Sequence, residues 1–173
     1  MAGKTPKEAA DNFIHYFKES LNCLSSHYVK AFQQTDKLYK IFYDPQPELT
    51  ARAAKYKVSI TQVFRVTPHP DDLKEFKART QEYSYVLLEE NGEKEVVSYH
   101  WHPNDPGVHY PHLHIPGSRV HFPTSRVCLE DFISMLHRDY DVKRNLSQAE
   151  CKKILEKNKK AFEKGATWKV QPR

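Results

Sequence analysis

The chain has 173 residues, of which 28% are charged and 39% hydrophobic, with a formal net charge of +5 and three cysteines. This composition argues against a disordered chain, and three widely spaced cysteines argue against a disulfide scaffold. We find no membrane-spanning segment and no signal-peptide pattern, so we expect a single domain (1–173) in the cytoplasm, without membrane contact. The positive charge favours an acidic partner such as nucleic acid.

The N-terminal part of the chain carries a helix-start pattern. Thr5 is a capping residue, Pro6 suits the first helical position, and Glu8 completes a capping box. Apolar residues then recur every three or four positions as far as Leu24. Three further apolar residues either extend this stripe or form a second short helix: Tyr28, Val29 and Phe32. We therefore expect an N-terminal helical region over 5–43, closed by a turn at 44–47.

The middle of the chain is typical of β-structure. Apolar and polar residues alternate over 56–66, which predicts an amphipathic strand. Segment 71–79 is compatible either with a short helix or with an excursion of the chain between strands. Two β-rich runs, 83–89 and 95–102, flank the turn dipeptide Asn91-Gly92 and predict a hairpin. A brief strand fits 111–115.

Two amphipathic helices are expected in the C-terminal region, 127–165. Apolar residues recur at helical spacing from Leu129 to Leu136, and Ser147 and Glu150 form a second capping box. The order of elements predicts an α+β fold, in which a small antiparallel sheet within 56–126 packs against N- and C-terminal helices.

The most unusual stretch, residues 99–126, contains six of the ten histidines. Four of them form two His-x-His pairs, His100/His102 and His112/His114. On strands each pair lies on one face, so suitable strand pairing would gather four imidazoles. No acidic residue occurs between Asp105 and Glu130.

Two kinds of chemistry fit these histidines. Neutral imidazoles bind transition metals, so His100, His102, His112 and His114 are candidate ligands of one metal ion, with Asp105 as the nearest acid. Alternatively, His112 and His114 act as acid and base in metal-free RNA cleavage, supported by His100 and His102. Arg119 and Arg126 would then hold the phosphate, and Tyr99 and Tyr110 would contact a base.

The missing acids favour an anionic ligand such as RNA over a metal, so we expect a ribonuclease or a related phosphodiester-handling enzyme without a cofactor. The alternatives are a metal-binding protein and a non-enzymatic interaction or nucleic-acid-binding module.

Residues 82–140 resemble the toxins of TumE-type toxin–antitoxin pairs. The resemblance rests on the order of Tyr83-Ser84-Tyr85, the Gly92 turn, His112-Leu113-His114 and Phe122-Pro123-Thr124-Ser125 before a helix with Leu129 and Phe132. It implies a small cytoplasmic toxin with ribonuclease activity, neutralised by a DNA-binding antitoxin. It also implies functional roles for His112 and His114.

Overall fold

The computed structural model describes residues 1–26, 29–43, 46–72 and 74–165. Its described residues confirm the α+β fold, with one nine-stranded antiparallel sheet and three helices. The strand order is β2-β3-β5-β6-β7-β8-β9, while β1 pairs with β6 and β4 pairs with β5. The sheet is therefore larger than the small sheet that the sequence predicted.

The strands are β1 (Ala2–Gly3), β2 (Val29–Thr35), β3 (Leu38–Tyr43), β4 (Glu48–Thr50), β5 (Lys55–Pro68), β6 (Phe76–Glu89), β7 (Glu95–Trp101), β8 (His112–His114) and β9 (Phe122–Pro123). The helices are α1 (Pro6–Leu21), α2 (Leu129–Asp139) and α3 (Gln148–Gly165). No helix in this described part of the chain is long and apolar enough to cross a membrane.

Helix α1 begins where the capping pattern predicted. The backbone N–H of Glu8 donates to Thr5 Oγ1 over 3.1 Å, and Pro6 occupies the first turn. This bond satisfies one of the backbone donors that a helix start leaves unpaired. The helix buries its apolar stripe, including Phe13 and Phe17, but it ends at Leu21.

The prediction of helical structure up to residue 43 was wrong. Strands β2 and β3 form a hairpin, in which Val29 pairs with Tyr43 and Ala31 pairs with Ile41. Lys37 adopts a φ of 60° in the turn between them. Strand β3 also pairs with β5, and these long-range hydrogen bonds outweigh the helix-like spacing of the apolar residues. Tyr28 and residues 44–45 lie outside the described residues.

The hairpin predicted around Asn91-Gly92 is confirmed. Gly92 has a φ of 76°, a backbone conformation that favours glycine, and its N–H donates to the Glu89 carbonyl over 2.8 Å. The ambiguous segment 71–79 contributes its last residues to β6, which begins at Phe76. The brief strand expected at 111–115 is β8.

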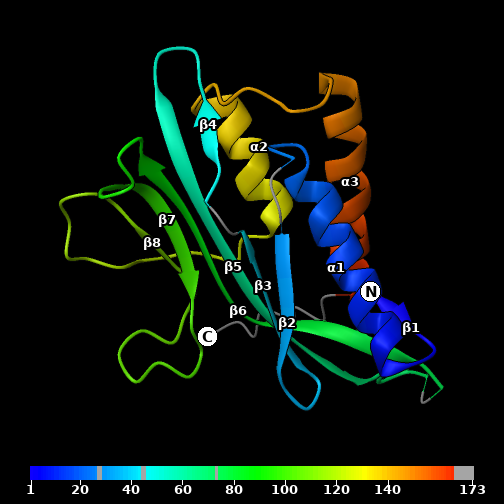
Figure 1. Ribbon diagram of the computed structural model, residues 1–173. Coiled ribbons are helices and arrows are strands. Elements are labelled where there is room, and N and C mark those ends of the chain that lie inside the picture. Colours follow the sequence, from blue (N-terminus) through cyan, green and yellow to red (C-terminus); the bar gives the residue numbers. More distant parts are fainter. Residues whose placement is uncertain (27–28, 44–45, 73, 166–173) are drawn as a thin grey trace.

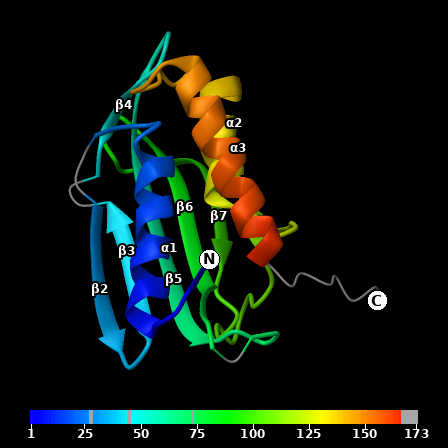
Figure 2. The same ribbon diagram turned by 90° about the vertical axis from the view of Figure 1, so that its right-hand side faces the viewer.

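All three helices lie on one side of the sheet (Figures 1 and 2). Tyr83, Tyr85 and Leu87 of β6 face these helices and are buried, and the Tyr85 ring lies 5.5 Å from that of Phe132 in α2. The alternate residues of each strand emerge on the opposite side. This opposite side, called the open face below, carries the candidate site.

Candidate functional site

The pairing of β7 with β8 gathers the two His-x-His pairs. His100 pairs directly with His112, and Ser98 pairs with His114. Cross-strand partners share a face, so all four imidazoles project from the open face, as the sequence predicted. The ring of His100 lies 5.6 Å from His102, 5.7 Å from His112 and 4.7 Å from His114.

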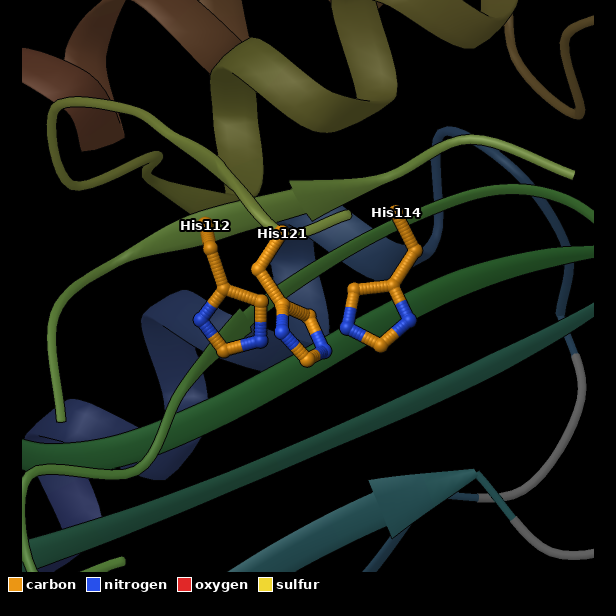
Figure 3. A group of neighbouring side chains, drawn as sticks. All are labelled: His112, His114 and His121. Atoms are coloured by element: carbon orange, nitrogen blue, oxygen red, sulfur yellow. The ribbon is translucent and has the colours of Figure 1, made fainter. Parts of the chain in front are cut away.

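A fifth imidazole, which the sequence analysis did not assign to the site, belongs to the same group. The His121 ring lies 4.6 Å from that of His114 and 4.9 Å from that of His112. Figure 3 shows that the rings of His112, His114 and His121 project from the backbone on the side away from helix α2. Because Leu113 pairs with Phe122, His121 lies beside His114. The turn residues Pro116-Gly117 were the signal for this second hairpin. The histidine cluster denotes these five residues: His100, His102, His112, His114 and His121.

An acid also lies at the histidine cluster, so the expectation of an acid-free site was wrong. Glu95, at the start of β7, places Oε2 3.9 Å from His114 Nδ1 and accepts a 2.7 Å hydrogen bond from Ser98 Oγ. Asp105, the acid considered from the sequence, instead accepts a 2.7 Å bond from the Gly107 backbone. Glu95 was overlooked because it precedes the histidine-rich stretch in sequence.

Two overlapping groups have the spacing of metal ligands. One is His112, His114 and His121, and the other is Glu95, His100 and His114. Within each group the candidate ligand atoms all lie within 4.8 Å of one another. Metal bonds of about 2.1 Å in a tetrahedron separate ligand atoms by about 3.4 Å, which small side-chain rotations would reach. His114 belongs to both groups.

The surroundings favour the neutral form of three of these imidazoles, those of His100, His112 and His114. Burial, followed by the proximity of His114, lowers the pKa of His100 to about 3. Burial also lowers the pKa of His112 and that of His114. A neutral imidazole is the form that binds a metal, whereas an imidazolium is the form that attracts an anion.

Hydrogen bonding leaves ring nitrogens available for a ligand. His112 Nδ1 lies 2.8 Å from the Tyr110 carbonyl oxygen, which only accepts, so Nδ1 carries the proton and Nε2 keeps its lone pair. Such a bond to the far nitrogen is typical of metal-bound histidines. Nε2 of His100 and Nε2 of His114 are buried without a hydrogen-bond partner among the described residues. Buried polar atoms in proteins nearly always have a hydrogen-bond partner or a ligand.

The other candidate residues are placed differently. The Arg126 guanidinium stacks 3.2 Å from the centre of the Trp101 ring, and Tyr99 packs 6.2 Å from Phe132. Tyr99 and Trp101 alternate with His100 and His102 along the chain, so Tyr99, Trp101 and the Arg126 stacked on it lie on the opposite side of the sheet from the histidine cluster. The Tyr110 ring lies 6.0 Å from His112. Arg119 is exposed in the connection between β8 and β9.

Similarity to known proteins does not assign this site. No protein family, curated protein or solved structure matches the chain. The resemblance to TumE-type toxins stays a prediction, as do the roles that it implies for His112 and His114. A function must therefore be argued from the chemistry of the imidazoles and the Glu95 carboxylate themselves.

Proposed function

We propose that the protein binds one transition-metal ion at the histidine cluster. The observation that carries this proposal is the convergence of imidazoles beside the Glu95 carboxylate, two of them with buried nitrogens that have no partner among the described residues. Imidazole ligands with one carboxylate suit zinc, iron, nickel and copper. His114 would be the central ligand, because it belongs to both groups of closely spaced ligand atoms.

Metal analysis of the untagged protein tests this proposal. After purification and dialysis we expect about one equivalent of metal in the wild type, and a loss of most of it in His114→Ala. His109→Ala is the matched control, because His109 is exposed and belongs to neither group of candidate ligands. Metal far below stoichiometry in the wild type, or equal metal in His114→Ala and the wild type, would contradict the proposal.

We propose RNA cleavage as a second candidate function. The observation that favours it is the position of the five imidazoles on the open face of the sheet, which the three helices do not cover (Figure 1). A polymer can reach such a face more easily than a closed pocket. An antitoxin protein as partner is part of this second proposal.

We also propose the cytoplasm as the location. Cys23, Cys128 and Cys151 are free and buried. Unpaired thiols suit a reducing compartment.

A further inference from the structure

A cavity lies on the open face beside the histidine cluster. Its volume is about 380 Å³, and its lining includes Lys40, Thr61, Arg65, Ser84, His102 and Asn104. This volume lies within the range of small-molecule sites. His102 lines the cavity while its ring lies 5.6 Å from that of His100, so the cavity and the histidine cluster adjoin.

Cross-strand pairing sets the distance between the cavity and the cluster. Thr61 pairs with Ser84, and Ser84 pairs with His100. These three side chains therefore form a row on the open face. Two strand spacings separate Thr61 from His100, which is about 10 Å. A ligand of modest size in the cavity would reach the imidazoles.

The charges in the cavity favour an anion. Lys40 and Arg65 line it together with Glu82, which leaves one net positive charge. Among the described residues, neither Lys40 nor Arg65 forms an ion pair, and the Lys40 ammonium lies 5.9 Å from the centre of the Phe42 ring. Within the described part of the chain, no ion-pair partner therefore offsets their positive charges.

A second arginine adds to the positive charge near Arg65. Arg65 pairs directly across the strands with Arg79, and like charges in that position repel each other. Arg79 Nε is buried and has no hydrogen-bond partner among the described residues. An anion bound beside Arg65 would lower this repulsion.

We propose that the cavity binds a small organic anion, whose carboxylate or phosphate oxygens contact Lys40 and Arg65. The hydroxyl groups of Thr61 and Ser84 and the amide of Asn104 offer hydrogen bonds that orient it. The far end of the ligand points to the histidine cluster, where a bound metal ion would polarise it. This last step rests on the proposed metal site, whereas anion binding by Lys40 and Arg65 does not.

Calorimetric titration with inorganic phosphate and with succinate tests the anion site and distinguishes a phosphate from a carboxylate ligand. The metal-free wild type binds at least one of these probes, and we expect Lys40→Gln/Arg65→Gln to weaken that binding about tenfold or more. Lys7→Gln/Arg52→Gln removes the same charge from exposed positions outside the cavity, and we expect its affinity to stay within about twofold of the wild type.

Measurements of metal content and of probe binding on both sets of variants show whether the metal site or the anion site is wrong. Lys40→Gln/Arg65→Gln should retain the metal content and melting temperature of the wild type, and metal-free His114→Ala should still bind the probe. We expect metal loading to tighten probe binding in the wild type and to leave His114→Ala unchanged. The proposal of an anion site is overturned if neither probe binds the wild type. It is also overturned if Lys40→Gln/Arg65→Gln binds the probe as tightly as Lys7→Gln/Arg52→Gln does.

Discussion

His100 has three other imidazoles of the histidine cluster close to its ring. Its ring lies within 5.7 Å of the rings of His102, His112 and His114. Burial and the nearby imidazoles both disfavour a proton on His100. Since an unfolded chain exposes this side chain to water, its pKa there returns to about 6.5. Proton binding is therefore linked to unfolding.

The sign of this linkage predicts an acid-sensitive fold in the metal-free protein. The pKa of His100 is about 3 in the folded state, so between pH 6.5 and 3 the unfolded chain binds more protons. The free energy of unfolding is therefore highest above pH 6.5, as far as His100 determines it, and it falls as the pH is lowered towards 3. Allowing for solvent screening, we expect the wild type to lose about 1 kcal/mol more than His100→Gln between pH 7.5 and 5.

Urea unfolding at the two pH values measures this difference. His15→Gln is the control, because the His15 side chain is 68% exposed and lies outside the histidine cluster. Equal pH dependence in His100→Gln and the wild type would show that His100 is not held neutral by its surroundings.

The three helices are joined by a buried polar junction. Ser20 of α1 donates to Glu130 Oε1 of α2 over 2.7 Å, and Asn158 Nδ2 of α3 donates to Ser20 Oγ over 3.0 Å. All three residues are buried, and burial raises the pKa of Glu130. These bonds fix the positions of the helices on the sheet, since polar groups in a core need their partners.

Removal of the central hydroxyl is expected to destabilise this junction. Ser20→Ala deprives the buried Glu130 carboxyl of its donor, so we expect a loss of about 2 kcal/mol in the free energy of unfolding. The loss should be smaller in a Glu130→Gln background, where no carboxylate is left unpaired. Urea unfolding of the two single variants and the double variant measures both values, and an equal loss in the two backgrounds would argue against a Ser20–Glu130 coupling.

One-sided covering is the main feature of the whole molecule. Helices pack on one side of the sheet (Figure 2). The open face carries five histidines, Glu95, Lys40 and Arg65. Most of the apolar core lies beneath the helices. The open face is thus not covered by helices, and the ligands proposed above depend on its imidazoles and cations.

The ribonuclease proposal is tested by RNA cleavage in EDTA. If histidines act as acid and base without a metal, the wild type cleaves RNA in EDTA, and His112→Ala/His114→Ala loses about a hundredfold or more. His109→Ala should retain full activity. Absence of cleavage over a panel of RNAs, equal activity in the double variant, or cleavage only after metal is restored would each contradict this metal-free mechanism.

Local sequence patterns were sufficient for several features. The cap at Thr5 and the Asn91-Gly92 turn placed α1 and the β6–β7 hairpin, because both depend on residues close together in the chain. Strand alternation put His100 with His102, and His112 with His114. The hairpin of β2 and β3 was missed, since pairing with the distant β5 decides it.

The sequence by itself determined the α+β class and the common face of each His-x-His pair, because these follow from local periodicity. Only the tertiary structure decided the composition of the site. The register of β7, β8 and β9 brought Glu95 and His121 to His114, while alternation along β7 left Tyr99 and Arg126 on the other side. Register depends on hydrogen bonds between separate segments, and these bonds placed the Glu95 carboxylate beside histidines from a stretch that has no acid of its own between Asp105 and Glu130.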